Sequence, residues 1–378
     1  MTVTVRRLDP DDAEVMLGHF REAFGAFDPP DPPVPLHAEG KYWWGVEVNG
    51  HLVATALDRA YESWFAGVKV PTAGIGAVAV APEHRGTGLV DPLLDALLGS
   101  ARERGAVIST LFATAPGVYR RLGYETITSL DHVRVPTHAL AVGGSTPVRR
   151  ADESDSAGIR DVHERAASRR NGRLSRTGPL FVNAPTLRVD GITVAERDGQ
   201  ICGYASWDRG RGYGAGAELQ VHDVEADDVD ALRSLLTTLS SFASVTPATV
   251  VRSSGLGAWR HLVRTDYAVP VTSSPYALAV LDLVALELLP FAGGVTATLP
   301  FTVDGIHRVL EVKDCRGVLH EGGDGGRGLS AGGLALTFAG AETSAGLRSV
   351  GHLTGPDADD AMWDMLFCRG PIHVHDYF

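Results

Sequence analysis

Residues 78–124 read VAVAPEHRGTGLVDPLLDALLGSARERGAVISTLFATAPGVYRRLGY, and this stretch is the most informative part of the chain. An apolar run, Ile75–Val80, ends shortly before Pro82, and a turn with two glycines follows. The next residues repeat leucine at the spacing of one helical face, at Leu89, Leu93, Leu94, Leu97 and Leu98. The pattern predicts a strand, a tight turn and an amphipathic helix with one buried face.

The turn His84–Gly88 has the properties of an anion site. The first backbone N–H groups of a helix have no acceptor within the helix, and the helix dipole favours negative charge there. Gly86 and Gly88 allow close approach to the backbone, and Arg85 adds a charged donor. No Gly-Lys-Ser/Thr follows, which excludes a P-loop, and the GxGxxG spacing of a Rossmann fingerprint is absent. The turn therefore predicts a binding site for a pyrophosphate group.

The chain contains a degenerate internal repeat. Val5–Asp12 (VRRLDPDD) is echoed by Val148–Asp155 (VRRADESD), each a short strand followed by an acidic helix-capping turn. Val46–Arg59 and Val194–Arg209 both read as hairpins, around Asn-Gly and Asp-Gly respectively. The same order of strand, helix and hairpin in both halves predicts two copies of one α/β fold, joined by the linker 143–147.

The second copy differs from the first where the chemistry is expected. Acidic residues at Glu225–Asp228 stand where the first copy has its glycine turn, ahead of a helix around Leu232–Leu239. Carboxylates would repel a pyrophosphate, so we expect this copy to bind neither a pyrophosphate nor a cofactor that carries one. From Pro275 onward a third region shows strand patterns, and its glycine-rich stretch Gly322–Gly333 is expected to form a surface hairpin.

Composition excludes several classes of protein. The chain has 378 residues and a formal net charge of −12, which argues against a nucleic-acid partner. Its three cysteines (Cys202, Cys315 and Cys368) lack zinc or disulfide spacing and favour a reducing compartment. The N-terminal residues do not read as a signal peptide, and no apolar run approaches about 18 residues. We therefore expect a cytoplasmic protein that does not span a membrane.

The C-terminal residues PIHVHDYF end in an aromatic pair, which predicts that the tail is docked on the protein. His373 and His375 alternate on one face of an extended segment, but no third ligand converges on them, so no metal site is predicted. The alternative is that these two histidines line the pocket of a substrate. Phe24–Phe27 and the aromatic residues Trp43, Trp44, Trp64 and Phe65 are candidates for the walls of an acceptor pocket or for the core.

Two elements in the chain resemble the GCN5-related N-acetyltransferases. That family has a V-x-P-x-x-R-G-x-G-L loop and, further on, a Tyr-x-Arg-x-Gly-Phe/Tyr element, which here are 80–89 and Tyr119–Tyr124. Glu83 departs from the usual Gln or Arg and is expected to point away from the anion. The resemblance implies acetyl-CoA as co-substrate. It places Val78, Ala79 and Val80 beside the pantetheine arm, Arg85, Gly86, Thr87, Gly88, Leu89 and Val90 around the pyrophosphate, and Thr114 and Ala115 on the next strand.

The family resemblance also implies a mechanism in which an amine attacks the thioester directly. Tyr119 takes the place of the general acid that protonates the departing thiolate, and the α-carboxylate of Phe378 takes the place of the general base. A phenol with a pKa of about 10 suits a thiolate of similar basicity. An α-carboxylate, with a pKa of about 3.5, is a weak base that burial would strengthen.

The whole arrangement resembles the enhanced intracellular survival (Eis) acetyltransferases of actinobacteria. The implied fold is α/β (α+β), with a catalytic domain at 1–142, a degenerate acetyltransferase-like domain at 147–274 and a sterol-carrier-like domain at 275–378 whose tail docks in the active site. The implied assembly is a homo-oligomer, namely a hexamer. The implied acceptors are primary amines, including aminoglycosides modified at several positions. Tyr377, where family members can have an acid, favours a more aromatic acceptor pocket.

Two alternatives stay open at this point. Protein lysines or polyamines are acceptors that the sequence does not separate from aminoglycosides. A protein that binds acetyl-CoA or an apolar ligand without catalysis is the other alternative, although such a protein would need neither Tyr119 nor Phe378 in these places.

Overall fold

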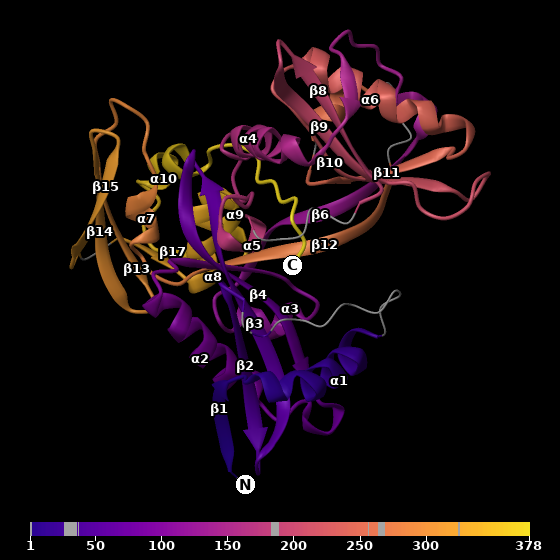
Figure 1. The fold of residues 1–378 in the computed structure, drawn as a ribbon. Coiled ribbons are helices and arrows are strands. Elements are labelled where there is room, and N and C mark those ends of the chain that lie inside the picture. The colour runs from indigo at the N-terminus through magenta and orange to yellow at the C-terminus, as the bar shows by residue number, and fades with distance from the viewer. Residues whose placement is uncertain are drawn as a thin grey trace.

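The computed structural model describes residues 2–25, 36, 38–182, 189–255, 257–263, 269–323 and 326–378. Figure 1 shows three lobes, with the N-terminal lobe in indigo, the middle of the chain in magenta and salmon, and the C-terminal lobe in orange and yellow. The C-terminus lies at the centre, where the lobes meet. No helix in the described part of the chain is both long and apolar enough to cross a membrane.

The first two lobes follow the same order of elements. The first comprises β1 (Val3–Arg7), α1 (Ala13–Phe24), β2 (Lys41–Val48), β3 (His51–Phe65), β4 (Val68–Val80), α2 (Val90–Glu103), β5 (Ile108–Phe112), α3 (Pro116–Arg120) and β6 (Glu125–Pro136). The second comprises β7 (Val148–Arg150), α4 (Ser156–Ala167), α5 (Pro179–Val182), β8 (Gly191–Arg197), β9 (Gln200–Asp208), β10 (Glu218–Ala226), α6 (Val229–Ser240), β11 (Ala248–Ser253) and β12 (Val269–Val280). The repeat predicted from the sequence is therefore confirmed.

Both predicted hairpin turns are present. Asn49 and Gly50 join β2 to β3 with φ of 52° and 82°, and Asp198 and Gly199 join β8 to β9 with φ of 51° and 75°. Two successive residues with positive φ define the type I′ turn, whose twist matches that of the flanking strands. Asn-Gly and Asp-Gly tolerate this conformation better than other pairs, so each turn follows from its dipeptide.

The two units exchange their long strands. Over the described residues, the strand order in the shared sheet is β1-β2-β3-β4-β5-β12-β6-β11-β10-β9-β8-β7. β12 pairs with β5 of the first unit, and β6 pairs with β11 of the second. The two exchanged strands pair with each other in the middle, from Val269↔Arg134 to Leu278↔Glu125. The predicted division at residues 274 and 275 thus lies within β12, a strand that belongs to the sheet of the first unit.

The third unit is a smaller sheet covered by helices. It comprises α7 (Ala285–Leu288), β13 (Ala297–Val303), β14 (Ile306–Lys313), β15 (Arg316–Glu321), β16 (Arg327–Leu329), α8 (Ala331–Ala339), α9 (Ser344–Ser349), β17 (Leu353–Thr354) and α10 (Asp360–Phe367). Its strands run in the order β15-β14-β13-β16-β17. The hairpin predicted at Gly322–Gly333 is wrong: β16 within this stretch pairs in parallel with β13, and α8 begins directly after it. Residues 324 and 325 lie outside the described part of the chain.

A largely buried cation holds the tail against both repeated units. The Arg176 guanidinium donates to Asp223 of β10 at 2.7 Å and to Asp376 of the tail at 2.6 Å. The segment around Arg176 also bonds to β3: the N–H of Ser175 donates to the carbonyl of Glu62, and the N–H of Trp64 donates to that of Arg173. The backbone N–H of His373 donates to the Asn171 carbonyl. The docked tail predicted from the terminal aromatic pair is therefore confirmed.

We expect Arg176→Gln to destabilise the protein by about 3–5 kcal/mol, because it leaves two buried carboxylates without their cation. Urea unfolding measures the change. Arg121→Gln is the control, since the Arg121–Asp91 pair is exposed at 61% and 40% and such pairs contribute about 0–1 kcal/mol. Equal unfolding free energies for the two variants would contradict the role given to Arg176.

Candidate functional site

A cavity of about 420 Å³ opens where β4 ends in the first unit. β4 pairs in parallel with β5 only as far as Ile75↔Leu111, so the two strands separate beyond that point. A bulge marks the same place: the register with β3 shifts, and Ala77 has a φ of 53°. The edge of β4 that faces away from β3 is thereby left free of strand partners, and Val78, Ala79 and Val80 line the cavity.

The glycine turn forms the floor at the start of α2. Gly86 and Gly88 have φ of 75° and 81°, and a Cβ added to either would meet no atom within 4 Å. Arg85 is exposed and donates from Nε to the Val80 carbonyl at 3.1 Å, which fixes the turn against the end of β4. An open surface of backbone at a helix start suits a phosphate group, so these residues fit the pyrophosphate that the sequence predicts.

Most of the residues predicted for the cofactor meet in this one cavity. The sequence-predicted residues that line it are Val78, Ala79, Val80, Arg85, Gly86, Gly88, Leu89, Val90, Thr114, Ala115 and Tyr119. Thr87 is not part of the lining, and its hydroxyl donates to the His84 carbonyl at 2.6 Å within the turn. Glu83 also lies outside the lining, as expected from the repulsion between a carboxylate and an anion.

Tyr119 of α3 lines the same cavity as the turn. Its ring is 8% exposed and contacts Tyr124 edge to face, with 6.0 Å between the ring centroids. Burial raises the pKa of Tyr119 above its ordinary value, so the phenol keeps its proton at neutral pH. A protonated phenol on the cavity wall is the form that a general acid requires.

The terminal residue lies beside the bulge of β4. A Cβ on Gly76 would be 3.4 Å from a backbone oxygen of Phe378, and one on Gly74 would be 3.1 Å from its ring. The Phe378 ring packs against Tyr61, with centroids 5.1 Å apart, and against Phe112, at 5.6 Å. The terminal carboxylate therefore sits next to the strand that lines the cavity, with aromatic rings around it.

Arg59 is a site residue that the sequence reasoning missed. Its guanidinium lies 5.8 Å from the centroid of the Phe378 ring, and its Nη1 is buried without a hydrogen-bond partner. Burial lowers the pKa of Arg59, and the neighbouring Tyr61 and Asp58 oppose that shift. The cavity lining also includes His84, Ala23, Phe24 and Val118, which the sequence reasoning did not assign to the cofactor. Only tertiary packing brings the end of α1 to this cavity.

Most of the aromatic candidates for an acceptor wall have other roles. Trp43 is 4% exposed in the core beneath α1, and Phe65 is 2% exposed and packs on Phe338. Trp64 donates to Glu164 at 3.2 Å in the second unit. Phe24 is the exception because it lines the cavity, whereas Ala26 and Phe27 lie outside the described residues.

No group of three or more His, Cys, Asp or Glu side chains is arranged to hold a metal within the part of the chain that the structure describes. His373 and His375 are 6% and 9% exposed and lie in the second unit, away from the cavity of the first. Their predicted alternative role, lining the acceptor pocket, is not supported by this position.

Comparison with known proteins agrees with this geometry. The acetyltransferase (GNAT) domain family matches residues 4–127. These residues are a GNAT acetyltransferase domain. An uncharacterized N-acetyltransferase of Streptomyces avermitilis is 31% identical over 232 residues, and N-acetyltransferase Eis of Mycobacterium tuberculosis is 38% identical over 82 residues. The matches cover 54% and 20% of both chains, so this chain spans about half, or less, of the length of these relatives.

The GNAT fold of the whole chain has a counterpart among solved structures. Eis1 from Mycobacterium abscessus superposes with a TM-score of 0.78 over 100% of both chains, at 19% sequence identity. The superposition shows that a solved structure has the same mixed α/β fold over the whole length of this chain. The site residues named above stay predictions about this GNAT domain.

We expect Gly88→Glu to weaken acetyl-CoA binding at least about a hundredfold. A glutamate at a φ of 81° is strained, and its carboxylate would point into the open cavity. There it would repel the pyrophosphate of acetyl-CoA. Two like charges about 4 Å apart repel by about 4 kcal/mol at an effective dielectric constant of about 20. Calorimetric titration with acetyl-CoA measures the affinity. Gly99→Glu on α2 is the control, because it adds the same charge in open space without a positive φ. Unchanged affinity for Gly88→Glu would place the pyrophosphate elsewhere.

Proposed function

We propose that the protein is an acetyl-CoA-dependent N-acetyltransferase that acetylates primary amines in the cavity of the first unit. The observation that carries the proposal is the meeting of three features around the end of β4: the open Arg85–Gly88 turn, the Tyr119 phenol and the docked Phe378. They come from distant parts of the sequence, and a protein that only bound the donor would not need the last two.

The donor is held by backbone rather than by side-chain charge. The turn at the start of α2 offers N–H groups to the pyrophosphate, and the free edge of β4 at Val78–Val80 can pair with the amides of the pantetheine arm. Acetyl-CoA supplies the thioester. N–H groups at the β4 bulge are placed to stabilise negative charge that develops on the thioester oxygen.

Proton transfer is assigned to Tyr119, which lines the cavity, and to Phe378, which lies beside Gly74 and Gly76 of β4 and is not part of the lining. Transfer forms a C–N bond and breaks a C–S bond, so the amine must lose a proton and the thiolate must gain one. The Phe378 carboxylate accepts the proton from the amine, and Arg59 beside it favours the ionised, proton-accepting form. Tyr119 gives its proton to the thiolate.

The surroundings of the terminal carboxylate favour aromatic recognition of the amine. Tyr61, Phe112 and Tyr276 contact the Phe378 ring, and Tyr377 contacts Phe112. The nearby acid Asp376 is already paired with Arg176. A protonated amine would be held by ring faces rather than by carboxylates. Because the chain is similar to Eis, we include aminoglycosides among the proposed acceptors. Polyamines and lysine side chains are the alternatives. Hexameric assembly and a cytoplasmic location belong to the same proposal.

A thiol-release assay with acetyl-CoA tests the proposal directly. The panel comprises an aminoglycoside, a polyamine, a lysine peptide and a monoamine with an aromatic body. Release of CoA that depends on one of these amines, with mass spectrometry of the acetylated product, is the expected result. Tight acetyl-CoA binding with no amine-dependent release across the panel would favour the non-catalytic alternative.

Tyr119→Phe should lower kcat by roughly 10²–10⁴-fold while acetyl-CoA affinity is kept, since the ring stays and only the acid is removed. Steady-state kinetics with the best acceptor measure kcat, and calorimetry measures affinity. Tyr213→Phe removes a phenol that is 86% exposed in the second unit and should change neither value. Wild-type turnover in Tyr119→Phe would reduce Tyr119 to a packing residue.

A C-terminal tag should abolish most activity, because the added residues convert the terminal carboxylate into an amide and displace the chain end. A proton acceptor must lie within about 3.2 Å of its donor, or one water away. An N-terminal tag, placed at β1 on the far side of the first unit, is the control (Figure 1). A C-terminally tagged protein that acetylates at the untagged rate would exclude the terminal carboxylate as base.

A further inference from the structure

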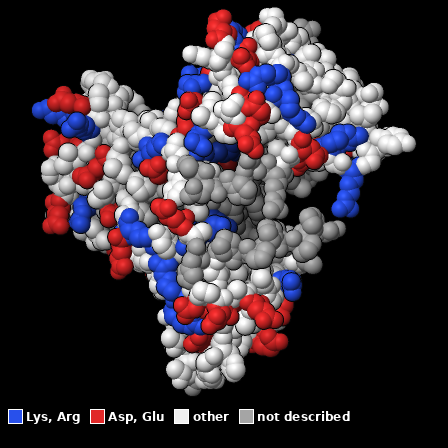
Figure 2. All heavy atoms as spheres, in the orientation of Figure 1, with Lys and Arg blue, Asp and Glu red and all other residues white. Residues whose placement is uncertain are grey.

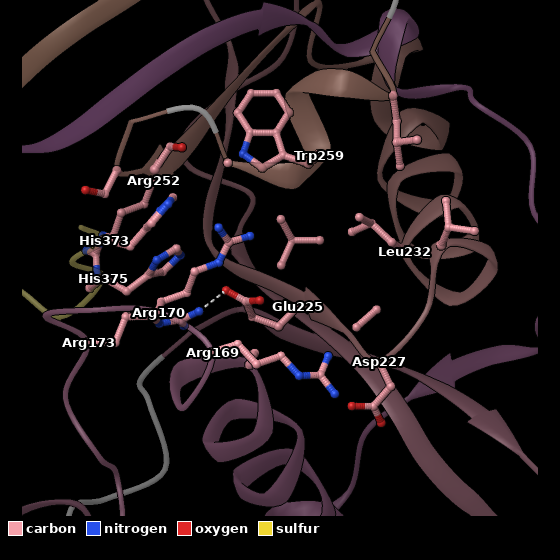
Figure 3. A pocket seen from close by; sticks show the side chains of 18 of the residues that line it. Arg169, Arg170, Arg173, Glu225, Asp227, Leu232, Arg252, Trp259, His373 and His375 are labelled. Atoms are coloured by element: carbon pink, nitrogen blue, oxygen red, sulfur yellow. Dashed lines mark hydrogen bonds and ion pairs between the residues drawn. The ribbon is translucent and has the colours of Figure 1, made fainter. Parts of the chain in front are cut away.

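The second unit contains a cavity of about 390 Å³ that the proposed acetylation does not use (Figure 3). It lies between the end of α4, the last residues of β10, the start of α6, the end of β11 and the C-terminal tail. Its size is within the range of small-molecule sites in proteins. Figure 2 shows that Lys and Arg are otherwise interspersed with Asp and Glu over this face of the molecule, which carries no extended basic surface.

The cavity occupies the same place in its unit as the acetyl-CoA cavity does in the first. The first cavity is lined by the end of α1, the end of β4, the start of α2 and the residues after β5. The elements α4, β10, α6 and β11 stand in the same order in the second unit. The repeat therefore leaves a ligand-sized space in both copies, and only the lining residues differ.

The second cavity cannot hold a pyrophosphate at its helix start. Asp228 caps α6, and its carboxylate accepts from the N–H groups of Asp230 and Ala231, both at 2.9 Å. The same carboxylate pairs with Arg197 at 2.6 Å. The backbone donors that would bind an anion are already used, so the absence of CoA binding expected from the acidic loop has a structural reason.

In the second cavity the positive charge comes from arginine side chains and not from the start of the helix. Arg169, Arg170 and Arg252 line the cavity, and none has an acidic partner among the described residues. In Figure 3, Arg170 and Arg252 lie on the same side as the two histidines, across the cavity from Asp227. The η₁ nitrogen of Arg252 makes one long contact, at 3.4 Å to the His375 carbonyl, and its Nε is buried without a partner.

The acids near this wall are neutralised by other cations. Glu225 pairs with Arg173 at 2.5 Å, and Asp227 pairs with Arg165 at 2.7 Å. Burial lowers the pKa of His373 to about 4, so this histidine is neutral at pH 7. Arg170 and Arg252 consequently keep an unbalanced positive charge inside the cavity, whereas Arg169 lines it from an exposed position.

The rest of the lining is apolar. Trp259 of η6 (Ala258–His261) is 5% exposed and forms one wall, with Leu232 and Leu262 near it. We propose that this cavity binds a small organic anion, in which a phosphate or carboxylate group lies against Arg170 and Arg252, Arg169 adds positive charge at the exposed side, and a planar or apolar body lies against Trp259. Guanidinium groups bind both headgroups by paired, charge-assisted hydrogen bonds.

The proposal is independent of the acetyltransferase activity, and its test is run in a Gly88→Glu background so that anions cannot report on the first cavity. Phenyl phosphate, benzoate and inorganic phosphate are titrated by calorimetry at constant ionic strength. One site per chain for phenyl phosphate or benzoate is expected, with the better probe identifying the headgroup. Weaker binding of inorganic phosphate is expected because it cannot contact Trp259.

Arg169→Gln/Arg170→Gln should weaken the better probe at least about tenfold, because each lost charge-assisted bond is worth more than a neutral one. Both side chains make no hydrogen bonds to the described residues, so the fold should persist, and circular dichroism checks it. Arg233→Gln/Arg316→Gln removes the same charge from exposed positions outside the cavity and should leave affinity within about twofold. No binding of either organic probe, or equal losses in the two double variants, would overturn the proposal.

Discussion

The structure depends on one buried cation shared between two carboxylates. Arg176 pairs with Asp223 in the second unit and with Asp376 in the tail, and all three groups are largely removed from water. Arg176 holds the pKa of Asp223 below its usual range, so the carboxylate stays charged despite burial. A pair of this kind fixes geometry because neither partner can move without leaving the other unpaired, and the tail that carries Phe378 is thereby set at one place.

The exchange of β6 and β12 explains why two repeated units behave as one body. Each strand completes the sheet of the other unit, and the two strands pair along their length. Unfolding one unit would expose the edges of the other, which is costly because edge strands leave backbone groups without partners. The second unit therefore has a structural role that does not depend on any ligand of its own.

The two copies show how one scaffold can serve two chemistries. In the first, glycines leave the start of α2 open, and a bulge frees the edge of β4. In the second, Asp228 closes the start of α6, and the cations Arg170 and Arg252 lie across the cavity from Asp227. The first cavity offers backbone N–H groups to a pyrophosphate, whereas the second offers guanidinium groups on another wall. The class of ligand proposed for the second cavity, a small organic anion, differs for this reason.

Much of the fold and part of the site could be predicted from local sequence. The type I′ turns at Asn49 and Asp198, the buried leucine face of α2 and the open turn at Gly86 and Gly88 each follow from residues close together in the chain. Short-range rules are sufficient there because the backbone conformation is set by the residues themselves.

Tertiary structure decided the features that join distant segments. The strand exchange, the parallel pairing of β16 with β13 and the position of Arg59 beside Phe378 have no local signal. The local sequence around an arginine in a strand does not show whether its side chain faces water or a terminal carboxylate. The same holds for Arg170, which reads as part of a solvated helix end although in the structure it lines a cavity with β10 and the tail. The surroundings that give a charge its function are set by packing and not by neighbours in the chain.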